Sequence, residues 1–228
     1  MKQLPLGVRL HDRAVFESFL AGANGAAVAA ARALAGAGGG MSLLYLHGID
    51  GAGKSHLLQA ICASVPGAAY LPLRELGALG ADALEGLEAV PLVAVDDPQC
   101  IAGDARWEQR LFSLYNARIA AGLRMAVAAP VPATDLPLAL ADLRSRLAAM
   151  PHYALRPLDE AQQREALKAR AAARGLDLPE ETLHYLQRRF ARDMGSLHAL
   201  LEKLDVASLE AQRPLTVPFI RSVLGDPP

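Results

Sequence analysis

Residues 48–55 read Gly-Ile-Asp-Gly-Ala-Gly-Lys-Ser and match the spacing Gly-x-x-x-x-Gly-Lys-Ser at every defined position. An apolar run, 41–47, precedes this loop, and a helical pattern begins at Lys54. Such glycines let the backbone wrap a chain of phosphates, while the loop N–H groups and the helix N-terminus favour an anion. We predict that Lys54 reaches the β and γ phosphates and that Ser55 ligates Mg²⁺. The predicted nucleotide contacts in this segment are Gly48, Gly51, Ala52, Gly53, Lys54, Ser55 and His56.

A second apolar run, Pro91–Val95, ends in Asp96 and Asp97, roughly 40 residues after the glycine-rich loop. An apolar strand that ends in acids is what a Walker B site needs. Asp96 is predicted to hold Mg²⁺ through water, and Asp97 to orient the attacking water. Many buried strands end in an acidic turn, so the pair indicates a nucleotide site mainly through its distance from the loop.

Strand-like and helical patterns alternate from residue 24 to residue 156. Strands are expected at 41–47, 69–73, 91–95, 124–129 and 153–156, and helices at 24–35, 54–64, 107–121 and 140–149. The segment 75–87 has helical content but contains three glycines. The alternation predicts an α/β fold with a five-stranded parallel sheet and covering helices.

The pattern changes after Pro157, where only helices are expected. Their predicted ranges are 159–174, 179–192, 196–211 and a short last helix that begins near Thr216. We therefore predict three parts of the chain, which are an extended N-terminal arm at 1–12, the α/β core at 13–157 and an all-helical domain at 158–228.

The composition argues against several classes of protein. The formal net charge is -1, so a general electrostatic grip on nucleic acid is not expected. Two cysteines, Cys62 and Cys100, indicate reduced thiols rather than a disulfide scaffold. The N-terminus lacks a signal peptide's apolar run, and no uninterrupted apolar stretch reaches the ~20 residues that span a bilayer. We expect a cytoplasmic protein without a membrane partner, and we find no metal-ligand spacing beyond the nucleotide's Mg²⁺.

A helical domain after a five-stranded P-loop core resembles the arrangement of the AAA+ ATPases. Within them, three segments of the chain resemble the DnaA replication initiators. They are Phe16-Glu17-Ser18-Phe19-Leu20-Ala21-Gly22-Ala23-Asn24, Asp96-Asp97-Pro98-Gln99 and Leu143-Arg144-Ser145-Arg146-Leu147. The resemblance implies an AAA+ P-loop core followed by a helical lid, and a contact between Asn24 and the adenine base. It also implies that Arg146, with Arg144 in reserve, acts in trans on the nucleotide of a neighbouring subunit. The alternative is that both arginines are surface charges at a helix end.

The N-terminal run Gln3-Leu4-Pro5-Leu6-Gly7-Val8 resembles the hexapeptide that binds sliding clamps, although Gly7 and Val8 depart from its consensus. Leu4 and Leu6 are predicted to fill an apolar groove of the clamp, with Gln3 at its edge. This arm and the run 215–220 make the chain similar to the Hda family of DnaA-related regulators.

That family resemblance implies a function and a set of ligands. The implied partners are the DnaA initiator and the clamp, which is the DNA polymerase III beta subunit. DNA would be reached indirectly through the clamp at the nucleoid, and a homodimer is left open. The implied activity is to promote ATP hydrolysis on DnaA and so to repress re-initiation of chromosome replication. The ligand is ADP or ATP with Mg²⁺.

Two departures from the AAA+ pattern predict weak intrinsic ATP hydrolysis. The fourth predicted strand and its end read Met125-Ala126-Val127-Ala128-Ala129-Pro130, without the usual polar sensor 1 residue. Gly195 stands where a sensor 2 arginine is usual, with Arg192 three residues upstream. Each lost dipole or charge removes transition-state stabilisation. Two alternative classes are a DnaC-like helicase loader that binds single-stranded DNA and helicase, and a small-molecule P-loop kinase.

Overall fold

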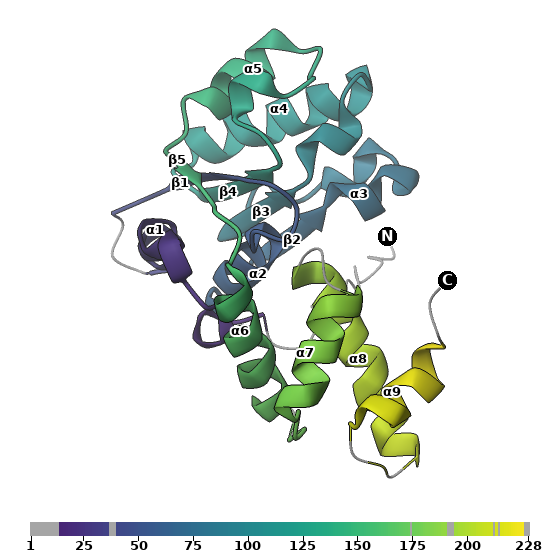
Figure 1. Ribbon diagram of the computed structural model, residues 1–228. Helices are drawn as coiled ribbons and strands as arrows, with labels where there is room; N and C mark the ends of the chain where they lie inside the picture. Colours follow the sequence, from purple (N-terminus) through teal and green to yellow (C-terminus); the bar gives the residue numbers. More distant parts are fainter. Residues whose placement is uncertain are drawn as a thin grey trace. The chain divides into compact units, whose positions relative to one another are not determined.

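The computed structural model describes residues 14–36, 40–173, 175–190, 194–211, 213 and 215–225 (Figure 1). The predicted N-terminal arm, with Gln3, Leu4 and Leu6, lies outside the described residues. The chain divides into two compact units near Arg156. The first unit reaches Arg156, and the second begins at Pro157 and also includes Asp50–Gly53 of the glycine-rich loop.

The first unit is built on one five-stranded sheet in the order β2-β3-β4-β1-β5, in which every pairing is parallel. The strands are β1 (Leu43–His47), β2 (Ala69–Pro72), β3 (Leu92–Asp96), β4 (Arg124–Ala129) and β5 (His152–Ala154). Every residue of β3 is buried, as expected for a central strand that is covered on both faces. The predicted α/β fold with a five-stranded parallel sheet is confirmed.

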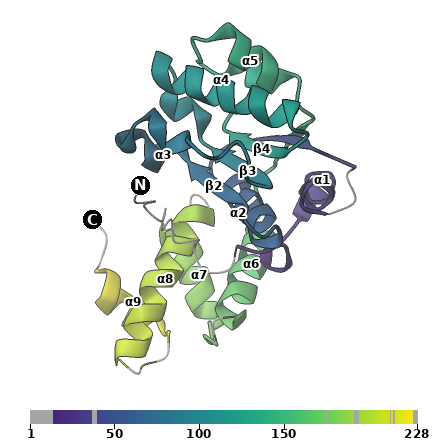
Figure 2. The same cartoon turned by 180° about the vertical axis from the view of Figure 1, so that it is seen from behind.

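Helices cover both faces of this sheet. Their bounds are α1 (Gly25–Ala35), α2 (Lys54–Ser64), α3 (Leu73–Leu76), α4 (Ala105–Ala120) and α5 (Ala141–Ala148). Figures 1 and 2 show α1 and α2 on one face and α4 and α5 on the other. The Asp104 carboxylate accepts hydrogen bonds from the N–H groups of Arg106 and Trp107, which explains why α4 begins where it does.

The segment 75–87 differs from a single helix. The short α3 is followed by two 3₁₀ turns, Gly77–Leu79 and Ala81–Leu84. Gly80 between the turns has φ 83°, and Gly86 after them has φ 80°. These left-handed conformations are accessible to glycine at little cost, and they prevent a continuous right-handed helix.

Arg118, a buried arginine that the sequence patterns did not single out, joins three segments of this unit. The Arg118 side chain is fully buried, and its guanidinium donates to the carbonyl oxygens of Leu87, Val90 and Arg124. Burial lowers the pKa of Arg118 to about 10, with the Arg124 charge acting in the same direction. The cation therefore ties α4 to the segment before β3 and to the start of β4.

The second unit is helical, with α6 (Glu160–Ala173), α7 (Glu180–Phe190), α8 (Met194–Ala211) and α9 (Val217–Leu224). Its apolar core is formed by Leu167, Ala171, Leu178, Leu183, Leu186, Leu201, Leu204, Leu215, Phe219 and Ile220. The start of α6 is capped reciprocally, because Asp159 Oδ1 accepts the Gln162 N–H and the Gln162 side chain accepts the Asp159 N–H. No helix within the described residues is both long enough and apolar enough to cross a membrane.

Candidate nucleotide-binding site

The topology brings the glycine-rich loop and the acidic pair to the two sides of one strand end. β1 leads into the loop and β3 ends at Asp96, and both strands pair with β4. The Gly48 N–H donates to the Ala129 carbonyl oxygen at 3.3 Å, and the Asp97 N–H donates to the adjacent Ala128 carbonyl oxygen at 3.0 Å. Ligands of open α/β sheets bind at such carboxyl ends, where neighbouring strands lead to opposite faces.

The glycines of the loop serve different purposes. Gly51 has φ 78° and Gly53 has φ 93°, so both adopt left-handed conformations. Gly48 is required by a close approach, since a Cβ at this position would lie 2.4 Å from the Leu155 carbonyl oxygen. The loop backbone can therefore turn in the way that a phosphate cradle needs.

Lys54 folds back onto this loop. Its side chain is largely buried, and Nζ donates to the carbonyl oxygens of Gly48 at 2.7 Å and Ile49 at 2.9 Å. The ammonium is therefore held at the start of the loop, and its positive charge adds to that of the N-terminus of α2. This arrangement suits the predicted contact of Lys54 with phosphate.

Asp96 fits the predicted Mg²⁺ site. Its side chain is 3% exposed, Oδ2 accepts a hydrogen bond from the Tyr70 hydroxyl at 2.7 Å, and Oδ1 is buried without a hydrogen-bond partner. Burial raises the pKa of Asp96, while its interactions with the Ser55 and Tyr70 hydroxyls oppose that rise. A buried carboxylate oxygen without a partner is costly unless a donor reaches it. A water of a hydrated Mg²⁺ would be such a donor, and Ser55 and Asp96 would hold the ion between them.

Tyr70 is a residue of this site that the sequence patterns did not identify. It lies on β2, and the register pairs Tyr70 with Ala94 and Pro72 with Asp96. Burial raises the pKa of the Tyr70 hydroxyl, as does the nearby Asp96 charge, so the hydroxyl stays protonated and can donate. The available signal was a polar residue in an apolar strand, which does not reveal its partner without the pairing of β2 with β3.

Asp97 is held by two side chains. Arg74 Nε donates to Asp97 Oδ2 at 3.0 Å, and Gln99 Nε2 donates to Asp97 Oδ1 at 2.7 Å. The Asp97 backbone is left-handed, with φ 56° and ψ 51°. Arg74, at the start of α3, is a second neighbour of the acidic pair that the sequence patterns did not identify.

Asn24 and His56 both hold the backbone of the first unit. The Asn24 amide donates to the Arg156 carbonyl oxygen at 2.9 Å and accepts the Arg156 N–H at 2.8 Å. His56 Nε2 lies 3.0 Å from the Val15 carbonyl oxygen and 3.3 Å from the Ser18 hydroxyl. The structure thus gives each side chain a structural partner, and their contacts with a nucleotide stay predictions.

The two candidate arginines of α5 have different surroundings. Arg144 Nη1 donates to the Leu138 carbonyl oxygen at 2.8 Å and so supports the segment before the helix. The Arg146 side chain is exposed and forms no hydrogen bond or ion pair with another described residue. Arg146 is therefore the arginine that a partner molecule can reach, as the predicted role in trans requires.

Glu108 anchors the start of that helix. Its side chain is 1% exposed, and its carboxylate accepts the N–H groups of Gly103 at 2.7 Å, Ala139 at 3.0 Å and Leu140 at 2.5 Å. Ala139 and Leu140 directly precede α5. Glu108 on α4 therefore fixes the N-terminus of the helix that carries Arg146.

The two sensor positions are occupied by alanines and by a glycine. The end of β4 consists of Ala128 and Ala129, and both are fully buried. Gly195 lies in α8, and the upstream Arg192 falls outside the described residues. Among the described residues, no group of three or more His, Cys, Asp and Glu side chains could hold a metal ion.

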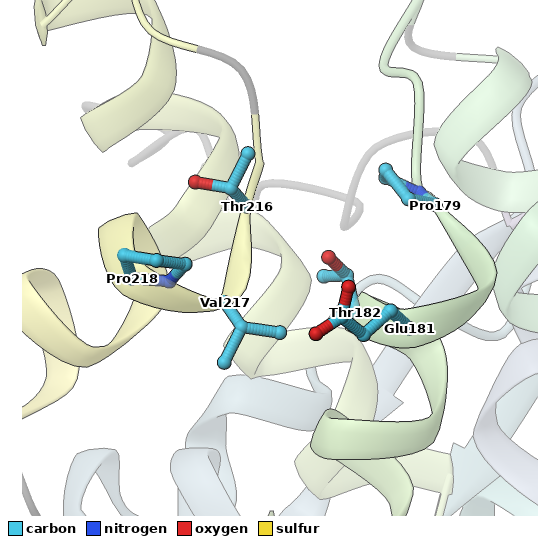
Figure 3. A pocket seen from close by; sticks show the side chains of 6 residues that line it. All are labelled: Pro179, Glu181, Thr182, Thr216, Val217 and Pro218. Atoms are coloured by element: carbon cyan, nitrogen blue, oxygen red, sulfur yellow. The ribbon is translucent and has the colours of Figure 1, made fainter.

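The helical unit has a hollow of its own, which Figure 3 shows between the starts of α7 and α9. It measures about 400 Å³ and is lined by Pro179, Glu181, Thr182, Thr216, Val217 and Pro218. The Thr182 hydroxyl donates to the Leu215 carbonyl oxygen at 2.9 Å, so it holds the two helix starts together. The lining includes the carboxylate of Glu181 and has no basic group among its described residues, unlike a phosphate site.

The first unit has a glycine-rich loop and an acidic pair beside the same strand of a five-stranded parallel sheet, and a helical unit follows it. These features define an AAA+ P-loop protein. Residues 10–69 match the family model of the bacterial DnaA ATPase domain, and residues 159–224 match the model of the Hda lid domain. The chain is therefore a DnaA-related protein of the Hda type.

Solved structures show the same fold. Domain III of the Thermotoga maritima replication initiation protein DnaA is 23% identical, with a TM-score of 0.78, over 93% of this chain and 96% of that domain. AMPPCP-bound DnaA from Aquifex aeolicus is 19% identical, with a TM-score of 0.70, over 89% of this chain and 68% of that one. The protein DnaI is 19% identical, with a TM-score of 0.53, over 64% of this chain and 89% of its own.

Proposed function

We propose that this chain is a nucleotide-binding regulator that is tethered to the DNA sliding clamp and promotes ATP hydrolysis on DnaA. In this way it would repress re-initiation of chromosome replication. The observation that carries the proposal is the exposed Arg146 on α5. The same chain has alanines at the sensor 1 position, at the end of β4. An arginine supplied in trans accelerates hydrolysis in a partner by stabilising charge in the transition state.

Adenine nucleotide binding is supported by the loop geometry, the Lys54 ammonium and the unsatisfied Asp96 oxygen. The similar DnaA of Aquifex aeolicus was solved with AMPPCP bound. We propose ADP or ATP as the ligand, with Mg²⁺ held by Ser55 and Asp96. A bound ion of this kind supplies positive charge that neutralises the phosphates.

We expect Lys54→Ala to weaken ADP and ATP binding by about 10- to 100-fold, because a buried charge-assisted contact contributes roughly 1.5–3 kcal/mol. Titration calorimetry of the full chain measures this loss. Lys168→Ala is the matched control, since Lys168 is an exposed lysine that pairs with Glu180 in the helical unit. Equal affinity of the Lys54 variant and the parent chain would contradict the assigned phosphate contact.

The clamp is proposed as the tether through Gln3, Leu4 and Leu6. An extended segment can place alternate apolar side chains in a groove while polar groups pair at its edge. Surface plasmon resonance tests this assignment by measuring binding to the clamp. It compares the full chain with the double variant Leu4→Ala, Leu6→Ala. Equal binding of both would remove the arm as the tether.

The proposed activity is tested by measuring hydrolysis of ATP that is bound to DnaA. The assay contains the chain, its nucleotide and clamp loaded on DNA, and the clamp is omitted in a parallel reaction. Clamp-dependent acceleration supports the proposal. No acceleration, together with binding to a replicative helicase and single-stranded DNA, would favour a helicase loader, and phosphoryl transfer to a nucleoside panel would favour a kinase.

A further inference from the structure

We propose that Asn24 supports nucleotide binding through the joint between the two units, Arg156–Pro157, and does not read the adenine base. The inference rests on the proposed nucleotide binding and concerns that same site. It makes Asn24 a positioning residue, because its side chain binds the chain's own backbone and not the nucleotide.

Asn24 stands at the start of α1 but does not cap that helix. Asparagine at this position usually accepts an N–H group of the first helical turn through its side-chain oxygen. Within the described residues, the Asn24 side chain accepts no such N–H group, although it is only 4% exposed. Its own backbone N–H donates to the Ala21 carbonyl oxygen at 2.7 Å, which fixes the residue at the helix start. The side chain is therefore committed to a different partner.

That partner is the backbone of Arg156. The Leu155 N–H donates to the His47 carbonyl oxygen of β1 at 2.6 Å. Arg156 follows directly, and the Asn24 amide donates to its carbonyl oxygen at 2.9 Å and accepts its N–H at 2.8 Å. A primary amide offers the same kinds of donor and acceptor as a peptide group, so Asn24 pairs with Arg156 much as a neighbouring strand would. The buried amide is thus used at the end of β5 and not on a base.

The pairing lies where one unit ends and the other begins. The first unit ends at Arg156, and the unit that begins at Pro157 also includes Asp50–Gly53 of the glycine-rich loop. Pro157 restricts the residue before it to extended conformations. Asn24 and Pro157 therefore both limit the backbone at this joint, one by hydrogen bonds and the other by its ring. A joint with more freedom raises the entropy that is lost when the loop orders around phosphate, and so weakens binding.

The expected loss of affinity does not depend on the base. Because the joint acts on the unit that includes loop residues, ADP and GDP should lose affinity by the same factor when Asn24 is replaced. A side chain that hydrogen-bonded adenine would instead favour ADP selectively, since guanine has an oxygen where adenine has its N6 amino group. The ratio of the two affinities therefore separates a positioning residue from a base contact.

The test is titration calorimetry of the full chain with ADP and with GDP. We expect Asn24→Ala to weaken both nucleotides by about fivefold, which is the scale of one hydrogen bond, and to leave the ratio of the two affinities unchanged. Asn116→Ala is the matched control, since it makes the same change within α4. It should leave both affinities as they are in the parent chain.

A second test needs ADP alone, at a temperature where every variant is folded. Pro157→Ala should weaken ADP binding by roughly two- to fivefold, because it frees the backbone of the joint. If both side chains act on one joint, the loss in the double variant Asn24→Ala, Pro157→Ala should be smaller than the product of the separate losses.

Two outcomes would overturn the role of Asn24 at the joint and leave the proposed function standing. One is that the separate losses multiply in the double variant. The other is that Asn24→Ala loses affinity for ADP and keeps its affinity for GDP. No binding of ADP or ATP by the parent chain would instead overturn the proposed function, together with the role of Asn24 that rests on it.

Discussion

Replacing Arg146 with alanine should abolish most of the proposed stimulation of DnaA-bound ATP hydrolysis, with an expected loss of about 10³-fold. Arg146 is exposed on α5 and forms no hydrogen bond or ion pair with another described residue. Its removal should therefore leave the fold and the chain's own nucleotide affinity unchanged. The loss is read from the rate of ATP hydrolysis on DnaA at saturating clamp and regulator.

Two further variants show whether the guanidinium of Arg146 acts directly. Arg146→Lys should recover only a small part of the stimulation, because lysine cannot form a bidentate fork with phosphate oxygens. Arg144→Ala should lower the free energy of unfolding by about 1–2 kcal/mol, since it removes the bond to the Leu138 carbonyl oxygen. It should leave stimulation largely intact at a temperature where the variant is folded. Full stimulation by Arg146→Ala would refute the proposed role in trans.

The second large effect is expected at Glu108. Glu108→Gln should lower the free energy of unfolding by about 2–4 kcal/mol at pH 7, because a buried carboxylate accepts three backbone N–H groups. The NH₂ group of a glutamine side chain would face at least one of these backbone N–H groups, so that two hydrogen-bond donors would oppose each other. Urea unfolding followed by circular dichroism measures the change. Glu85→Gln is the control, since Glu85 is an exposed partner of Arg110, and its effect should stay below about 0.5 kcal/mol.

The difference between the parent chain and Glu108→Gln should depend on pH in one direction. Burial acts to raise the pKa of Glu108, but the N–H groups of Leu140, Ala139 and Gly103 outweigh it and hold the pKa below its usual value. A carboxyl group whose pKa is lower in the folded than in the unfolded state stabilises the fold. This stabilisation is fully present above the pKa of the unfolded state, about 4.3. That contribution is lost as the pH falls through the lower folded pKa. The difference should thus be constant from pH 7 to about 5 and shrink below, and a constant difference down to pH 3.5 would contradict the assignment.

Much of the fold was predictable because the relevant signals are local. The apolar run 124–129 coincides with β4, and the helical pattern that begins at Lys54 coincides with α2. Glycines interrupt the helical pattern in 75–87, so the sequence did not predict whether a continuous helix forms there. In the structure, glycines in left-handed conformations prevent a continuous helix. The arm at 1–12 lies outside the described residues, so its contacts with the clamp remain a prediction.

Some residues of the candidate site were likewise predictable from the sequence, and others were not. The residue types at Lys54, Ser55, Asp96 and Asp97 point to phosphate and Mg²⁺ through spacing along the chain alone. Tyr70 and Arg74, which contact the acidic pair, cannot be identified from spacing. Their contacts depend on the pairing of β2 with β3. Spacing along the chain carries no information about register between strands that lie far apart in sequence.

The sequence by itself determined the strand–loop–helix unit at residues 41–64, the acidic strand end at Asp96 and the change to helices after Pro157. Those features follow from short-range periodicity and from the conformational freedom of glycine. The tertiary structure alone decided that Gly48 and Asp97 bond to neighbouring carbonyl oxygens of β4. It also decided that Arg144 is engaged at Leu138 while Arg146 is exposed. The physical reason is that strand order and burial arise from packing across the whole unit, where two arginines only two residues apart meet different surroundings.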